Sequence, residues 1–132
     1  MTEEELINQF SNKDQFAKLC GVVVDSASGG KATGHIDVAP EHLNAMFRIQ
    51  GGALFTLADT VAAAAANSLG LPAVTLQSNI QFLRPAQASG RLTARAHVSA
   101  DHHKLPAIEV RISDAQGLEV FLSTSIFYVK ER

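Results

Sequence analysis

The sequence predicts an α+β fold in which an antiparallel sheet of five to six strands wraps around one long central helix. Two observations support this prediction. A single helical segment of small and apolar residues occupies the middle of the chain, from Gly51 to Leu69. Most other segments alternate apolar and polar residues, which is typical of strands with one buried face. Because the order is α-β-β-α-β-β-β-β, a curved sheet around that helix buries both in two layers.

Length and composition restrict the class of protein. The 132 residues, 46% of them hydrophobic, are enough for one folded domain, which we expect to span residues 1–132. The net charge of −2 and the scattered basic residues argue against a nucleic-acid partner. Cys20 is the only cysteine, so no intrachain disulfide can form and a reducing compartment fits. The acidic N-terminus has no secretory signal and the apolar run 61–66 cannot cross a membrane, so we expect a cytoplasmic protein without a membrane partner.

The N-terminal residues 2–19 are expected to form one helix. Thr2 can cap its first turn, because Glu5 follows three residues later and completes a capping box. A loose apolar stripe would attach this helix to the core. The members of the stripe are Leu6, Ile7, Phe10, Phe16 and Leu19.

Two strands should follow, joined by a tight hairpin. Residues 22–25 form the first, and the sequence SASGGK supplies a turn in which Gly29 and Gly30 can adopt positive φ. Residues 31–38 form the second, with alternate residues on one apolar face. Those residues are Ala32, Gly34, Ile36 and Val38.

The central helix is expected over residues 51–69. Gly70 and Pro72 end it, because glycine caps a helix C-terminus and proline cannot continue one. Its small residues 62–66 require a close neighbour, which is either the helix's own sheet or a dimer contact.

Four strands follow the central helix. In the first, one face is expected to hold the large apolar residues Val74, Leu76, Ile80 and Phe82, with Thr75 on the other face. The remaining strands are expected at residues 92–100, 105–112 and 118–129. β-branched and aromatic residues are frequent in the last of them, which agrees with strand structure.

Several motifs, in this order, resemble those of a known family. They are Asn44, Gly51-Gly52, the sequence F-T-L-A-D at 55–59 and the sequence I-Q-F-L-R-P-A at 80–86. Over roughly residues 35–129 the chain resembles the hotdog-fold thioesterases of the 4-hydroxybenzoyl-CoA thioesterase superfamily, in particular the phenylacetate-degradation (PaaI-like) branch. The resemblance implies hydrolysis of an acyl-CoA thioester, with coenzyme A as part of the substrate and no separate cofactor. It also implies a homodimer with sites at the subunit interface, and many relatives are tetramers.

The resemblance assigns roles to individual residues. Asp59 would be the catalytic carboxylate, as general base or nucleophile. The backbone N–H of Gly51 would polarise the thioester carbonyl, with Gly52 beside the substrate. Asn44 would position the thioester or the attacking water. Thr75 falls where some relatives carry a serine or threonine near the carboxylate.

Two positions depart from the family pattern. Gln50 stands directly before Gly-Gly, where relatives usually have His; its amide can donate a hydrogen bond to substrate but cannot carry an imidazole's charge. Phe47 stands in a loop position where many relatives have Gly, and with Met46 and Phe55 it should influence which acyl group fits. An acyl-CoA-binding protein without hydrolysis (a carrier, sensor or regulator) therefore stays open as an alternative. An acyl hydratase is a weaker one, because the Asp/His motif of those relatives is absent.

The residue types themselves favour the assigned chemistry. A helix N-terminus offers unpaired N–H groups and a partial positive charge, and glycine there lets a carbonyl approach the backbone. Asp59 is the only charged residue between Gly51 and Leu69, so little solvent-exposed helix face remains for it. A partly desolvated carboxylate has a raised pKa, which suits a general base. A purely structural protein would leave this acid unexplained.

The spacing of the two groups predicts a dimer. Eight residues of helix span about 12 Å, so Gly51 and Asp59 of one chain are too far apart to act on one carbonyl carbon. If two helices meet across a two-fold axis, Gly51 of one subunit comes close to Asp59 of the other. We therefore expect an obligate homodimer with two equivalent composite sites.

Other candidates are weaker. Arg84 and Lys104 are basic residues that could meet the phosphates of coenzyme A. His102 and His103 are adjacent, but no carboxylate or cysteine at ligand spacing accompanies them, so we expect a surface turn and no metal. His42 is isolated and is expected to be a surface or loop residue.

Overall fold

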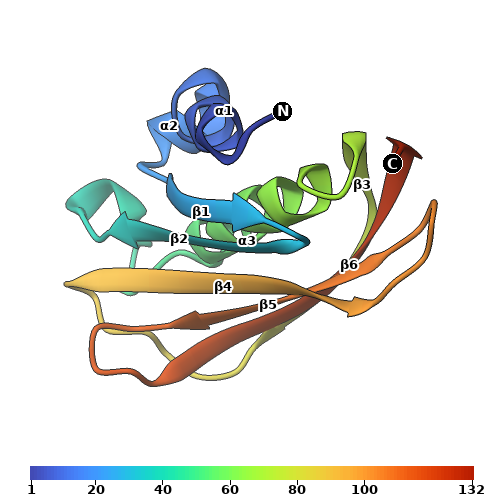
Figure 1. Ribbon diagram of the computed structural model, residues 1–132. Coiled ribbons are helices and arrows are strands. Elements are labelled where there is room, and N and C mark those ends of the chain that lie inside the picture. The colour runs from blue at the N-terminus through green and yellow to red at the C-terminus, as the bar shows by residue number, and fades with distance from the viewer.

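The computed structural model describes all 132 residues. A six-stranded antiparallel sheet with the order β1-β2-β4-β5-β6-β3 curves around one long helix, α3 (Figure 1). The helices are α1 (Glu3–Asn8), α2 (Gln15–Leu19) and α3 (Gly51–Asn67). The strands are β1 (Val23–Ser28), β2 (Lys31–Asp37), β3 (Leu71–Phe82), β4 (Arg91–Ala100), β5 (Ala107–Ser113) and β6 (Glu119–Glu131). The predicted fold class is confirmed, and no helix combines the length and apolar character needed to span a bilayer.

The N-terminal segment is two short helices and not the single helix expected over residues 2–19. The capping box forms as predicted: Thr2 accepts a hydrogen bond from the Glu5 N–H, and the Glu5 carboxylate accepts one from the Thr2 N–H. After a π turn, Asp14 has extended backbone and caps α2, where its carboxylate accepts the Ala17 N–H at 3.1 Å. Asp14 competes with helix continuation because a short side-chain acceptor favours a new N-cap.

This break redirects the apolar stripe of the N-terminal segment. Leu6 and Phe10 are buried against the core. Phe16 and Leu19 are exposed, with 63% and 78% of their surface accessible to solvent. The expectation that all five stripe residues attach this segment to the core is therefore wrong for the two on α2.

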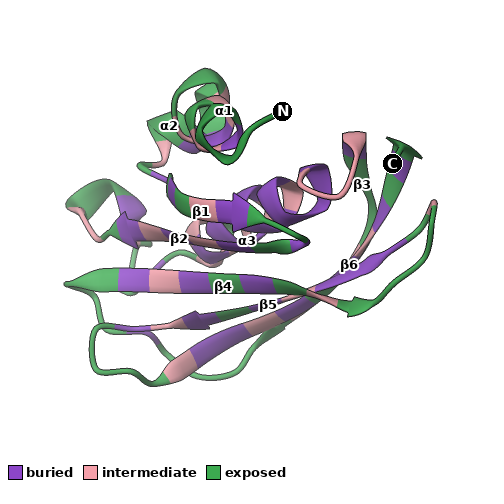
Figure 2. Cartoon of the chain, in the orientation of Figure 1, coloured by how far each residue is buried: buried purple, intermediate pink, exposed green.

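Helix α3 begins at Gly51 as predicted and ends at Asn67, with Ser68 as its C-cap, two residues before the expected end. Four of its five consecutive alanines, Ala62 and 64–66, are buried within the single chain, so no dimer contact is needed to cover them (Figure 2). One close neighbour of α3, at Val61, is β2. A Cβ on Gly34 would lie 2.6 Å from Val61 Cγ2 and 2.7 Å from the Val23 carbonyl oxygen, so only glycine allows this approach.

Four strands direct alternate residues toward α3 as the sequence pattern predicts. The buried residues on this face include Ala32 and Ile36 of β2, Leu92, Ala94 and Ala96 of β4, Ile108, Val110 and Ile112 of β5, and Phe121 and Phe127 of β6. Together with Leu57 and Val61 of α3 they form the core.

Strand β3 departs from the predicted alternation. Its pairing with β6 shifts register between Thr75 and Gln77, which leaves Leu76 as the extra residue of a β-bulge. Residues paired directly across two strands lie on the same face of the sheet, and Thr75 pairs with the buried Phe127. The bulge thus turns Thr75 toward α3, opposite to the face expected from the sequence.

The same bulge divides the apolar face expected on β3. Beyond it, Ile80 and Phe82 pair with the inward residues Ser123 and Phe121, so they also face α3. Val74, before the bulge, lies on the outer face. The prediction that Val74, Leu76, Ile80 and Phe82 share one face is therefore wrong, because a single extra residue inverts the alternation.

Candidate active site

The N-terminus of α3 presents an unpaired donor. Gln50 is the N-cap, and its Oε1 accepts a hydrogen bond from the Gly52 N–H. The Ala53 N–H donates to the Gln50 carbonyl oxygen at 2.9 Å, whereas the Gly51 N–H has no hydrogen-bond partner in the chain. The helix dipole adds partial positive charge at this donor. Gly51 therefore offers a hydrogen bond to an incoming carbonyl or anionic oxygen.

Both glycines have close neighbours at the Cβ position. A Cβ on Gly51 would lie 3.1 Å from the ring of Phe82, and one on Gly52 would lie 2.6 Å from Gln50 Oε1. A side chain at Gly52 would therefore displace the Gln50 cap. The cap uses the Gln50 oxygen and leaves the two amide hydrogens on Nε2 available to a ligand.

Gly51 lines a cavity of about 420 Å³ that also contains basic side chains. Arg48 and Arg84 lie in this cavity, and it contains no acidic residue. The Arg84 guanidinium donates to the Glu119 carbonyl oxygen, which orients it. Arg84 and Gly51 thus line the same cavity, which is the position that Arg84 needs in order to contact the phosphates of coenzyme A.

Asp59 lies on the partly open face of α3, with Gly52 and Thr56 on the preceding turns. The Thr75 hydroxyl donates to Asp59 Oδ1 at 3.0 Å. Burial raises the pKa of the Asp59 carboxyl, the negative charge of Asp14 raises it further, and the Thr75 hydrogen bond partly opposes this increase. The structure thus places Thr75 beside Asp59, the proximity that the family resemblance implies.

Replacing Thr75 with valine should raise the pKa of Asp59 further. Valine keeps the shape of threonine but removes the hydroxyl that stabilises the ionised carboxylate. The carboxyl ¹³C signal of Asp59, followed by NMR during a pH titration, should move to a higher midpoint. Thr75→Ser retains the hydroxyl and is the matched control. An unchanged midpoint in Thr75→Val would show that this hydrogen bond does not act on Asp59.

Asn44 organises the loop before α3 and has no contact with Asp59. Its Oδ1 accepts the N–H groups of Met46, at 2.9 Å, and Arg48, at 3.1 Å. The expected role of Asn44 with substrate therefore requires its free side-chain NH₂ group, because its oxygen is already engaged.

Phe47, in this loop, has a left-handed backbone with φ of 59° and is 76% exposed. Glycine adopts this conformation at little steric cost, which gives a physical reason for the Gly that the family resemblance places here. We expect Phe47→Gly to raise the free energy of unfolding by roughly 0.5–1 kcal/mol, since relieved strain of about 1–2 kcal/mol exceeds the added chain entropy. The midpoint of urea denaturation measures this, and Phe47→Ala, which retains Cβ, should show no gain.

Lys104 lies far from the other candidate residues of its own chain. It follows β4 in the turn at the opposite end of the sheet from the N-terminus of α3 (Figure 1). Its Nζ donates to the Lys130 carbonyl oxygen at 2.6 Å and lies 5.8 Å from the centre of the Tyr128 ring. Within one chain, Lys104 therefore lies apart from Gly51 and Arg84, and its contact with the phosphates of coenzyme A stays a prediction.

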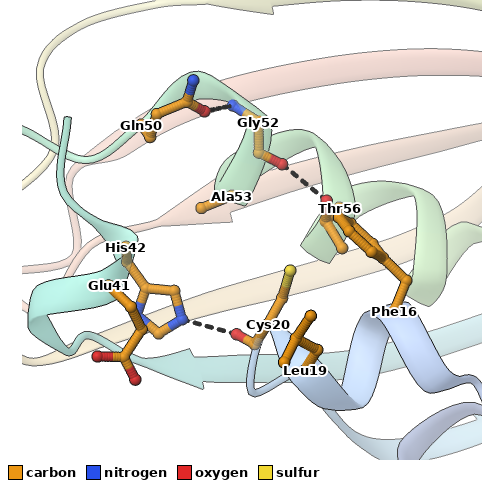
Figure 3. Close-up of a pocket in the computed structure, with 9 residues that line it drawn as sticks. All are labelled: Phe16, Leu19, Cys20, Glu41, His42, Gln50, Gly52, Ala53 and Thr56. Atoms are coloured by element: carbon orange, nitrogen blue, oxygen red, sulfur yellow. Dashed lines mark hydrogen bonds between the residues drawn. The ribbon is translucent and has the colours of Figure 1, made fainter.

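His42 is a structural residue in the short helical turn Pro40–His42, so of the two expected positions, surface or loop, only the surface is wrong. It is buried, and its Nδ1 accepts the Ala39 N–H at 2.9 Å. Its Nε2 therefore carries the proton and donates to the Cys20 carbonyl oxygen at 2.6 Å (Figure 3). No motif marks this histidine, because both of its partners are backbone groups and one of them, Cys20, is distant in sequence. The ring fixes the end of α2 beside the N-terminus of α3.

Comparison with known proteins agrees with this geometry. The family model described as the Thioesterase superfamily matches residues 49–121. Acyl-coenzyme A thioesterase PaaI of Escherichia coli (strain K12) is 38% identical over 109 residues, which are 83% of this chain and 78% of that protein. Acyl-coenzyme A thioesterase 13 of Homo sapiens is 30% identical over 97 residues, 71% of this chain and 69% of that protein.

Solved structures show the same likeness. The E. coli PaaI protein from the phenylacetic acid degradation operon superposes with a TM-score of 0.85 at 32% identity, covering 97% of this chain and 96% of that one. A hypothetical thioesterase protein with coenzyme A from Streptococcus pneumoniae superposes with a TM-score of 0.82 at 25% identity, covering 92% and 98%. Mutants of that protein, with alanine in place of an aspartate or a threonine, have similar structures.

The sheet wrapped around α3, with a half-buried acid on the helix and a free amide at its start, defines a protein of the hotdog class. Within this class, the chain belongs to the thioesterase superfamily, and its similarity to PaaI places it in the PaaI-like branch.

Proposed function

We propose that this protein hydrolyses acyl-CoA thioesters, in two composite sites of a homodimer. Each site combines the N-terminus of α3 from one protomer with Asp59 of its partner. The observation that carries the proposal is the pair of complementary groups on α3: a free N–H at Gly51 and a half-buried carboxylate at Asp59. The first can stabilise negative charge on oxygen, and the second can remove a proton or attack carbon.

The relatives support this substrate class. The E. coli and human proteins are named acyl-coenzyme A thioesterases, and the pneumococcal protein was solved with coenzyme A. The aspartate and threonine replaced in the pneumococcal mutants lie sixteen positions apart. Asp59 and Thr75 have the same spacing in this chain, and here they are joined by a hydrogen bond.

The chemistry divides between the two protomers. The Gly51 N–H donates to the thioester oxygen and stabilises the negative charge that develops there. The ionised Asp59 carboxylate acts as a general base toward water, or as the nucleophile. Its raised pKa makes it more basic than an ordinary carboxylate, so it accepts a proton more readily. Gln50 Nε2 is free to donate to the substrate and can replace one hydrogen bond of the histidine expected at that position.

The edge strand β3 supplies a reason for the dimer. It is twelve residues long and lies at the end of the sheet, so its outer backbone groups are unpaired. Leu76, in the bulge, is 59% exposed, and Val74 and Phe82 are also exposed. A long, exposed and apolar edge strand of this kind tends to pair with another strand unless it is protected. A second β3 would provide one and would bring a partner's α3 close to Asp59.

Leu76→Glu should separate the protomers and abolish hydrolysis. A carboxylate at this apolar edge would have no partner in the interface, and an unpaired buried charge is strongly unfavourable. Light scattering at micromolar concentration should give a dimer for the unmodified protein and a monomer for Leu76→Glu. Leu118→Glu, at an exposed leucine in the β5–β6 turn, is the matched control and should remain dimeric. A monomeric unmodified protein would rule out the composite site.

Release of free thiol from a panel of short, medium and aryl acyl-CoAs tests the proposed activity. We expect turnover of at least one ester, measured against the spontaneous rate. If acyl-CoAs bind in calorimetry but none is hydrolysed, the non-catalytic acyl-CoA-binding function replaces this proposal.

A further inference from the structure

A second cavity lies on the other side of the α3 N-terminus, between α2 and α3. Its volume is about 530 Å³, within the range of about 300–1,000 Å³ that is usual for small-molecule pockets. Phe16 and Leu19 come from α2 and Cys20 follows it, while Ala53 and Thr56 come from α3 (Figure 3). The cavity is therefore built by the segment whose apolar side chains the core leaves exposed.

Hydrogen bonds hold both ends of α2 in place, so the side of the cavity that α2 forms has a fixed position. The Asp14 carboxylate caps the start of α2, and the His42 ring holds the carbonyl of Cys20 at its end. The backbone of His42 also accepts the Gln50 N–H at 2.8 Å. One residue thus connects the end of α2 with the start of α3, on the two sides of the cavity.

The two cavities beside the α3 N-terminus differ in charge. The one that contains Gly51 has two arginines and no acid, which suits the phosphates of coenzyme A. The one lined by α2 contains no lysine or arginine, and its one acidic residue is Glu41. Gln50 and Gly52, the neighbours of Gly51 in sequence, both line it. A thioester carbonyl at Gly51 could therefore have an anionic part on one side and an apolar part on the other.

We propose that the cavity between α2 and α3 binds the acyl group of the substrate, and that it selects uncharged acyl groups. This inference rests on the proposed function and adds a substrate class to it. Phe16 and Leu19 supply apolar contact area that grows with acyl length. Glu41 repels a second carboxylate at the far end of a dicarboxylic acyl group, and no cation in the cavity compensates for that charge.

Substitution of the α2 wall tests the length dependence. Phe16→Ala should lower the ratio of kcat/KM for hexanoyl-CoA to that for acetyl-CoA by about 10-fold, because lost apolar contact affects only the longer chain. Lys18→Ala is the matched control, since Lys18 is exposed on the same helix and does not line the cavity. If α2 instead contacts a partner subunit, Phe16→Ala will change the oligomeric state and lower both rates equally, and the proposal is then wrong.

A pair of equal-length acyl groups tests the charge selection. The unmodified protein should prefer hexanoyl-CoA to adipoyl-CoA, which differs only by its terminal carboxylate. Glu41→Gln should reduce this preference several-fold without favouring longer chains. Equal use of both esters by the unmodified protein would overturn the charge selection, while turnover of either would leave the proposed hydrolysis intact.

The single cysteine provides a readout that does not depend on turnover. Cys20 is half-buried and lines the cavity, so iodoacetamide can report whether the cavity is occupied. In Asp59→Asn, hexanoyl-CoA should slow alkylation of Cys20, whereas coenzyme A alone should not. Equal protection by coenzyme A alone, or no protection by hexanoyl-CoA at concentrations that bind in calorimetry, would show that the acyl group lies elsewhere.

Discussion

Asp59→Asn is expected to lower kcat for thioester hydrolysis by about 10²- to 10⁴-fold, the usual contribution of a general base. The same change should raise the melting temperature by roughly 2–5 °C, because it removes a charge from a partly desolvated position. Asparagine keeps the oxygen that accepts the Thr75 hydroxyl, so the local packing is retained. Thiol release and calorimetry on one preparation measure both effects.

The gain in stability should depend on pH. Because the pKa of Asp59 is raised in the folded protein, the folded state holds its proton at pH values where the unfolded chain has lost it. Stability therefore falls as pH rises from the ordinary carboxyl pKa through the raised one. Asp59→Asn lacks this fall, so its advantage should be greatest at neutral pH and disappear in acid.

Asp101→Asn is the control for this comparison. Its hydrogen bond with Arg132 lowers the pKa of Asp101, which is the opposite situation, and its removal should not stabilise the fold. Turnover that survives in both Asp59→Asn and Asp59→Ala would remove Asp59 from the mechanism.

Mixing two inactive variants should restore activity if the sites are composite. Asp59→Asn lacks the carboxylate, and Gly51→Val blocks approach to the free N–H. A mixed dimer has one site with both defects and one site with neither. After subunit exchange, half of the dimers are mixed, so about a quarter of the unmodified activity should return. Thiol release before and after joint refolding measures the recovery.

Two outcomes would contradict the composite site. If Gly51 and Asp59 of the same chain served one substrate, every site in the mixture would carry a defect, and no activity would return. If Gly51→Val alone retained full activity, approach to the backbone at Gly51 would not be required. Gly51→Ala, a smaller change against the exposed Phe82 ring, gives a second variant in case valine prevents folding.

The sequence predicted most of the fold because most elements follow simple periods. The apolar face of β4 alternates from Leu92 to Val98, where a bulge follows, and α3 begins at the Gly-Gly pair as expected. The same clarity allowed Asp59 to be recognised, since it is the one acid in an otherwise apolar helix. The separation of Gly51 and Asp59 likewise followed from helix geometry alone.

The differences between the predicted and the observed fold come from single residues. Such a residue either ends a helix or shifts which face of a strand its neighbours occupy. Asp14 is a polar residue in a helical pattern, and only the structure shows that it starts a new helix. Leu76 looks like any apolar strand residue, and its bulge depends on pairing with β6. For the same reason the hydrogen bond between Thr75 and Asp59 could not be predicted from the alternation of β3, which places Thr75 on the wrong face.

The bulge at Leu76 also determines where this chain can change length. Before the bulge, the odd-numbered residues of β3 face α3, and Thr75 among them contacts Asp59. After the bulge, the even-numbered residues face α3, and Phe82 among them lies beside Gly51. Both contacts are possible only because of the extra residue between them. Insertion or deletion of one residue between these two positions would turn one of them away from α3. Variants of β3 with one residue inserted or deleted between Thr75 and Phe82 should therefore lose function, and variants with two residues inserted or deleted should retain it.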